Sequence, residues 1–149
     1  MGQQQLLLVI LVTIIVGVAT VTAINIFGAS AENSAIDATR QDILTMGAQM
    51  QGYALKPELM GGGGGDFTGL TVDKLGFGYT EKTSDTAFEN GNAAYSLTVA
   101  ADGSSVEITA TPHRLADATT WSPKAFTVTV LKDDISVDTE PAKATASAS

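Results

Sequence analysis

The chain opens with a long apolar stretch. Residues 6–27 read LLLVILVTIIVGVATVTAINIF, and the polar side chains among them are Thr13, Thr20, Thr22 and Asn25. As a helix, this stretch would be about 33 Å long, which is enough to cross the hydrocarbon core of a bilayer. A buried strand is disfavoured because strands rarely exceed about 10 residues. Isolated threonines are tolerable in such a helix because their hydroxyls can bond back to its carbonyls. We therefore predict a helix that inserts into a membrane at some stage.

The flanks of this stretch do not match the usual targeting segments. A secretory signal has a basic n-region and an apolar run of about 7–15 residues, whereas residues 1–5 are uncharged and the run is longer. A simple single-pass anchor carries Lys or Arg at its cytoplasmic end, but the first basic residue is Arg40. A lipoprotein signal needs a cysteine, and there is none. Charge therefore specifies the orientation of the helix only weakly.

Beyond the apolar stretch, the helical pattern continues as an amphipathic one. Residues 29–55 contain no proline, and apolar residues recur every seven positions as Ile36, Ile43 and Met50, with Leu44 beside the second. This is a narrow apolar stripe on an otherwise polar helix. We predict that the stripe packs against the rest of the protein.

The predicted helix has a defined end and a weak point. Pro57 disfavours helical geometry at the residue before it, so the helix should run from about residue 3 to Leu55, roughly 80 Å. Gly17 lies among modest helix formers, and we expect the rod to loosen or bend there if anywhere. Small residues recur at four-residue spacing as Ala19, Ala23, Ala31 and Ala35. Such spacing can let the backbones of two helices approach closely, although alanine is also simply a good helix former.

Residues 56–71 form a glycine-rich connector. Pro57 and the five glycines of residues 61–65 disfavour regular structure. A phosphate-binding loop would need a following Lys-Ser/Thr pair, but Asp66 follows and would repel phosphate. We expect either a flexible linker or a loop whose backbone packs closely against a neighbour.

Residues 72–138 show the short alternating runs of an antiparallel β-sheet head. Residues 95–99 and 106–110 alternate apolar with polar side chains on either side of the turn signal Asp102-Gly103, which predicts a hairpin. We expect a sheet of three to five strands with one apolar and one threonine-rich face. The apolar face would pack on the helix stripe, which gives an α+β fold.

Three further segments complete the predicted head. Residues 125–131 and 135–137 indicate two more strands, and residues 75–79 are a weaker candidate because two glycines interrupt them. Residues 139–149 are a low-complexity tail of small and polar residues.

The uncharged N-terminal segment and the remainder of the chain differ in their charge. The 149 residues include 8 basic and 16 acidic ones, and every charge lies from Glu32 onward. The absence of cysteine excludes disulfides, thiolate metal sites and a cysteine nucleophile. A single histidine, His113, excludes a histidine-built metal site. Net acidity without a basic cluster argues against a nucleic-acid partner.

Few residues are candidates for catalysis or metal binding. His113 lies in a loop-like stretch between strands, where a solvated surface residue is the simpler interpretation. Asp133, Asp134 and Asp138 lack the twelve-residue ligand pattern of a calcium loop. Trp121 is either a core residue or an inter-subunit contact. We therefore expect no enzyme, no cofactor and no metal.

An uncharged N-terminal helix that continues as an amphipathic one and then meets a small β-sheet resembles the type IV pilins. The sequence-specific part of the resemblance covers residues 3–37. In that family a prepilin peptidase cuts a short leader after a glycine, and the apolar helix waits in the inner membrane. Assembly machinery then builds an extracellular helical filament of identical subunits, in which the apolar helices form the core and the heads the exterior.

The resemblance assigns roles to residues of this chain. Ile36, Ile43, Leu44 and Met50 would hold the head. The filament core would be formed by Leu6, Leu7, Leu8, Ile10, Leu11, Ile14, Ile15, Gly17, Ala19, Ala23, Ile24 and Phe27. The family has a glutamate at mature position five that is thought to pair with a neighbour's amino terminus. Here Gln5 takes that place if Met1 is the first residue, and Leu7 does if cleavage follows Gly2, so a polar contact of the glutamines would have to substitute for the charge pair.

Two other functions are compatible with the same sequence features. A minor pilin or a secretion pseudopilin would differ from a major subunit in abundance. A single-pass membrane protein that displays a β-sheet binding module is the alternative of a different class. Removal of residues 1–28 would distinguish it, because a binding module would keep its ligand and a filament subunit would lose assembly.

Overall fold

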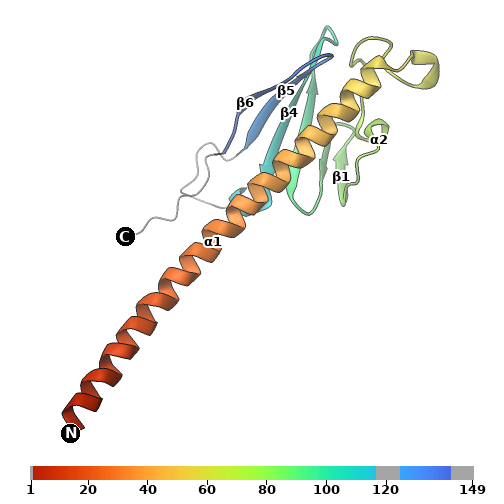
Figure 1. The fold of residues 1–149 in the computed structure, drawn as a ribbon. Coiled ribbons are helices and arrows are strands. Elements are labelled where there is room, and N and C mark those ends of the chain that lie inside the picture. Colours follow the sequence, from red (N-terminus) through yellow and green to blue (C-terminus); the bar gives the residue numbers. More distant parts are fainter. Residues whose placement is uncertain (1, 117–124, 142–149) are drawn as a thin grey trace.

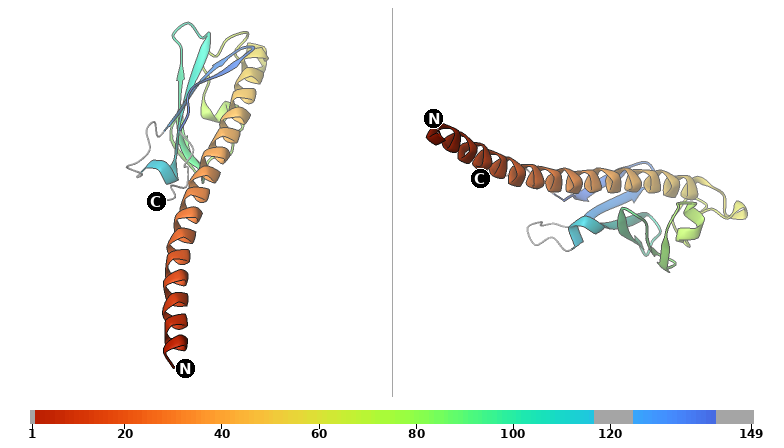
Figure 2. Two further views of the ribbon diagram at one scale, coloured as in Figure 1. Left: turned by 60° about the vertical axis from the view of Figure 1, so that its left-hand side comes forward. Right: turned by 90° about the horizontal axis from the view of Figure 1, so that it is seen from below.

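The computed structural model describes residues 2–116 and 125–141, and it shows an α+β fold. One long helix carries a six-stranded antiparallel sheet on its C-terminal half (Figure 1). Helix α1 runs from Gly2 to Leu55, which confirms the prediction of a single rod that ends before the proline. It remains helical through Gly17, where we expected loosening, and its N-terminal half projects from the head with a gentle curve (Figure 2).

The sheet is a meander in which each strand pairs with its neighbours in the chain. Its strands are β1 (Glu81–Ser84), β2 (Ala87–Glu89), β3 (Ala93–Val99), β4 (Ser105–Pro112), β5 (Phe126–Leu131) and β6 (Ile135–Thr139). The hairpin predicted around Asp102-Gly103 is β3 and β4, with Val99 opposite Val106. The two predicted strands that follow are β5 and β6, so both are confirmed.

Two expectations for the head were wrong. The sheet has six strands rather than three to five, because the edge strand β1 and its neighbour β2 are too short to show a recognisable alternation. Residues 75–79 do not form a strand. Instead, Val72–Leu75 is the short helix α2. Gly76 ends this helix with a left-handed backbone conformation, at a φ of 64°, which residues other than glycine rarely adopt. The remaining short elements are the 3₁₀ turn η1 (Glu58–Met60) and helix α3 (His113–Ala116).

The two faces of the sheet differ as the alternation predicts. On the inner face, cross-strand rows of apolar side chains are buried; they are Phe88–Tyr95–Ala110–Phe126 and Leu97–Ile108–Val128. On the outer face, the corresponding row is Ser96–Thr109–Thr127. The rings of Phe88 and Tyr95 stack with centroids 5.0 Å apart. Helix α1 crosses the inner face and contacts β4 and β5, so the helix and the sheet share one core.

Candidate assembly surface

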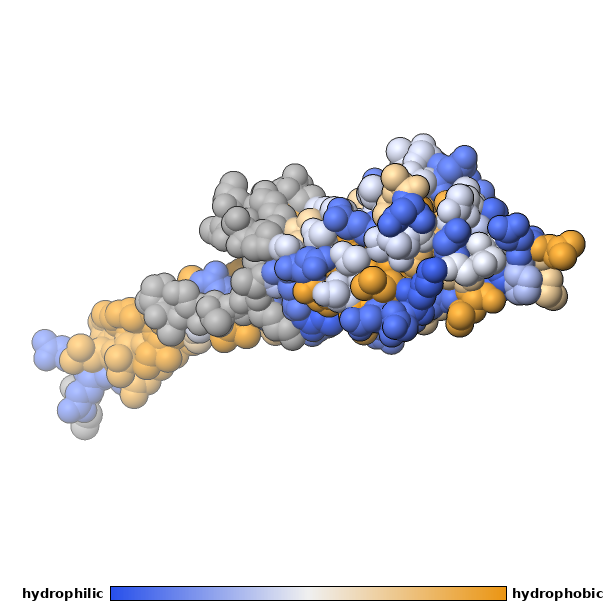
Figure 3. Space-filling model, turned by 90° about the horizontal axis from the view of Figure 1, so that it is seen from above, coloured by the Kyte–Doolittle hydropathy of each residue, from blue (hydrophilic) through white to orange (hydrophobic). Residues whose placement is uncertain are grey.

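Between residues 6 and 27, α1 exposes apolar side chains around its whole circumference. Fifteen large apolar side chains in this range are 47–74% exposed. Figure 3 shows the segment as a largely apolar rod that extends from the mixed surface of the head. By length and composition this helix could cross a membrane. We call this segment, residues 6–27, the apolar rod.

The predicted core-forming residues all lie on the apolar rod. Leu6, Leu7, Leu8, Ile10, Leu11, Ile14, Ile15, Gly17, Ala19, Ile24 and Phe27 are exposed, and Ala23 is half-buried. Full burial of one large apolar side chain stabilises by about 1.5–3 kcal/mol. At roughly 60% exposure, the fifteen large side chains therefore leave on the order of 20 kcal/mol to be gained by covering them. Contacts within this subunit supply none of that burial.

The polar side chains of the apolar rod divide into two groups. The threonine hydroxyls donate to carbonyls one turn back, for example Thr13 to Val9 O at 2.7 Å and Thr20 to Val16 O at 2.8 Å. Thr22 does the same with Val18 O at 3.0 Å. The amide of Asn25, in contrast, has no hydrogen-bond partner among the described residues, and the side chain is exposed.

The C-terminal half of α1 joins this surface to the head. Ile36, Ile43 and Met50 are at most 2% exposed, so the stripe packs on the sheet as predicted. The expectation for Leu44 was wrong, because its side chain is 48% exposed. It lies about 100° around the helix from its neighbour in the stripe. Met46 takes the buried place on the sheet side instead.

A carboxylate beside the stripe ties the helix to the sheet. Asp42 Oδ2 accepts hydrogen bonds from Asn90 Nδ2 at 2.9 Å, Asn92 Nδ2 at 2.8 Å and the Tyr95 hydroxyl at 2.8 Å. Burial, followed by the hydrogen bond to Asp42, raises the pKa of the Tyr95 phenol well above its usual range. Sequence reasoning missed this cluster, although Asp42 adjoins the stripe and Asn90-Gly91-Asn92 is a turn signal.

Helix α1 also holds the edge strand β6. The helix approaches the strand closely at Gly47, where a Cβ would lie 2.7 Å from Ile135 Cδ1. Gln51 Nε2 donates to Leu131 O at 3.0 Å in the β5–β6 turn. Arg40 forms an ion pair with Glu140, just beyond β6. Together these contacts fix the head along the helix on the β6 side.

The glycine-rich connector folds back as a cap on the C-terminus of α1. The backbone N–H of Gly63 donates to Tyr53 O at 2.9 Å, and that of Gly65 donates to Ala54 O at 2.8 Å. A Cβ at Gly63 would collide with a neighbouring backbone oxygen. Of the two expectations for this segment, the closely packed loop is therefore confirmed. These N–H groups satisfy the orphan carbonyls of the helix end and are not directed at a phosphate.

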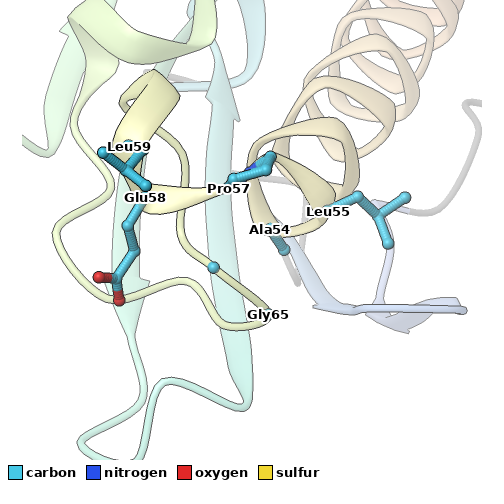
Figure 4. A pocket seen from close by; sticks show the side chains of 7 residues that line it. Ala54, Leu55, Pro57, Glu58, Leu59 and Gly65 are labelled. Carbon is cyan, nitrogen blue, oxygen red and sulfur yellow. The ribbon is translucent and has the colours of Figure 1, made fainter.

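An open depression lies beside this cap. It is lined by Ala54, Leu55, Pro57, Glu58, Leu59, Gly64 and Gly65. In Figure 4 the side chains of Leu55 and Leu59 point away from each other. Glu58 is the only ionisable side chain among the described residues that line it, so no constellation of catalytic groups meets here.

The other residues considered for chemistry are dispersed. His113 is exposed at the start of α3, and its Nε2 lies 2.9 Å from Asn90 O. Asp133 and Asp134 are exposed in the β5–β6 turn. Asp138 is exposed near the end of β6, where it accepts from Thr129 Oγ1 at 2.6 Å. Within residues 2–116 and 125–141, no group of three His, Cys, Asp or Glu side chains is placed to hold a metal ion. Trp121 and residues 142–149 of the tail lie outside the described residues.

No known protein family, curated protein or solved structure matches this chain. The features of the described residues that bear on function are the apolar rod and its joint to the head.

Proposed function

We propose that this protein is a structural subunit of an extracellular, type IV pilus-like filament and polymerises through its apolar rod. The observation that carries the proposal is the exposure of the apolar rod on every side. A helix of this kind is stable in lipid or among other apolar helices, but not in water. Packing of the rods of successive copies side by side would cover them without lipid.

The joint between rod and head supports a filament rather than a tethered module. Helix α1 continues without a break from the apolar rod into the head, where Ile36, Ile43 and Met50 are buried under the sheet. Because the head is held rigidly on the helix axis, rods that pack in a regular way would also place their heads regularly. A display module needs no such rigid joint.

Before assembly, the same surface would lie in the inner membrane. The 54 residues of α1 include a stretch that is long and apolar enough to span the bilayer. Processing by a prepilin peptidase and extraction by a pilus assembly machinery are the steps implied by the resemblance to type IV pilins. The protein would serve as a building block without catalytic activity.

The test is to shear the surface of cells that produce the protein, to image the released fraction by electron microscopy, and to identify its protein by mass spectrometry. We expect fibres that contain this chain. The variant Ile14→Lys places a charge in the middle of the apolar rod and should abolish the fibres. Ser96→Lys introduces the same charge on the exposed outer face of the sheet and should leave them intact.

Several outcomes would contradict the proposal. One is the absence of fibres in the wild type while the protein remains as detergent-dependent monomers. Another is normal fibres from Ile14→Lys. If a chain lacking residues 1–28 bound a ligand as well as the intact protein, the membrane-anchored binding module would be the better description.

A further inference from the structure

We propose that the glutamine side chains at the N-terminal end of one copy hydrogen-bond to Asn25 of a second copy displaced by about 30 Å along the fibre axis. The inference rests on the proposed function, because it describes how apolar rods are placed against one another in a filament. It names Asn25 as the residue that fixes their register.

The first step is that Asn25 needs an external partner. The threonine hydroxyls of the apolar rod are satisfied by carbonyls of their own helix, as for Thr13 and Thr20. An asparagine amide offers two N–H donors and one carbonyl acceptor, and that of Asn25 is exposed and has no partner among the described residues. Once rods cover one another and exclude water, this amide must be paired by a neighbouring copy.

The second step is that the other end of the apolar rod carries the matching groups. Gln3, Gln4 and Gln5 are exposed and have no hydrogen-bond partner among the described residues. Their amides both donate and accept, so they complement an asparagine amide without any charge. An amide pair across helices is also a known means of fixing register in packed helices.

The third step is the spacing of these polar groups. Gln5 and Asn25 are 20 positions apart in an unbroken helix, and at 1.5 Å per residue they are separated by about 30 Å. A stagger of that length aligns the glutamines of one copy with the asparagine of the next. A displacement of that length leaves little of the two rods side by side, so further copies at smaller staggers must cover the leucines and valines between the two amides. Those apolar side chains cannot hydrogen-bond to the glutamines, which therefore face Asn25.

An arrangement with zero stagger would align the glutamines of one copy with the glutamines of the next. The following crosslinking experiment distinguishes this arrangement from the stagger of about 30 Å. The natural chain has no cysteine, so engineered cysteines are its only thiols. One chain carries Gln5→Cys and another Asn25→Cys, and the two are co-assembled with an excess of wild-type subunits so that fibres form in either case. A mixture of Gln5→Cys with Val16→Cys is the control for an intermediate stagger.

After mild oxidation, we expect the Gln5→Cys and Asn25→Cys mixture to give at least five times more heterodimer than the Val16→Cys control. Predominant homodimers of Gln5→Cys, or stronger crosslinking to Val16→Cys, would overturn the proposed register while leaving the filament intact. An absence of wild-type fibres would overturn the proposed function as well.

A second measurement does not depend on disulfide geometry. The variant Asn25→Asp should reduce fibre yield at least tenfold, because it buries a carboxylate opposite neutral amides. Combination with Gln5→Lys in the same chain should restore most of the yield, because every lysine then meets an aspartate of the next copy. A normal yield from Asn25→Asp alone, or no rescue by the second substitution, would overturn the pairing.

Discussion

Replacement of Asp42 by alanine should loosen the joint between the helix and the head. The carboxylate accepts three hydrogen bonds from the sheet, one each from Asn90, Asn92 and Tyr95. These donors come from the β2–β3 turn and from β3, which are distant in sequence from the helix. We therefore expect Asp42→Ala to act on the docking of the whole head and not on the helix alone.

The magnitude follows from the burial of each donor. The asparagines lie near the surface of the turn, so water can replace part of what they lose. Tyr95 is 2% exposed, and its hydroxyl would remain without a partner, at a cost of about 1–3 kcal/mol. With the lost charge-assisted hydrogen bonds, we expect the free energy of unfolding to fall by about 2–4 kcal/mol. Asp42→Asn keeps one acceptor oxygen and should cost about half as much.

The assay is urea unfolding of the intact protein in detergent micelles, followed by near-ultraviolet circular dichroism of the stacked Phe88 and Tyr95 rings. Asp133→Ala is the matched control, because it removes an exposed carboxylate and should change stability by less than about 0.5 kcal/mol. Tyr95→Phe combined with Asp42→Ala should cost at least about 1 kcal/mol less than the sum of the single variants. Additive effects, or an Asp42→Ala variant as stable as the control, would refute the reasoning.

Gly63→Ala should lower the free energy of unfolding by at least about 2 kcal/mol, because there is no space for the added Cβ. Gly52→Ala should raise the free energy of unfolding by up to about 1 kcal/mol, because nothing lies within 4 Å of the added Cβ. Equal effects of the two variants in urea unfolding would contradict this prediction. The raised pKa of Tyr95 means that the folded state holds its proton more tightly than the unfolded state, in which the pKa of tyrosine is about 10. The contribution of Tyr95 to stability should therefore be constant below that pH and fall above it, and Tyr95→Phe should reduce the fall in unfolding curves measured from pH 8 to 11. Finally, Ile36→Ala should lower the free energy of unfolding by about 2–4 kcal/mol, because it opens a cavity at a fully buried position. Leu44→Ala should lower it by less than about 1 kcal/mol, because this side chain is exposed. A larger loss from Leu44→Ala than from Ile36→Ala would show that the packing of the helix is misassigned.

Much of the fold could be predicted because its signals are local. The uncharged stretch and the absence of proline before Pro57 determine one long helix, and the alternation on either side of Asp102-Gly103 determines the central hairpin. The two short strands β1 and β2 were not predicted. Glu81–Ser84 and Ala87–Glu89 are short, and they become strands because β3 offers hydrogen-bond partners to β2, which in turn pairs with β1.

The candidate assembly surface was likewise accessible from the sequence, because it depends on composition alone. Every residue of the apolar rod is apolar or self-satisfied except Asn25, and no folding of the head can change that. The apolar surface that this helix leaves exposed is therefore a property of the chain from residue 6 to residue 27.

The joint between helix and head, in contrast, was decided by tertiary structure. A seven-residue repeat identifies a stripe but not its width, so only the position of the sheet exposes Leu44 and buries Met46. The contacts of Asp42 with the β2–β3 turn span about fifty residues of sequence, and periodicity carries no information about such pairs. Periodicity and composition describe what each segment must hide from water, whereas the partner that hides it depends on how distant segments meet in space.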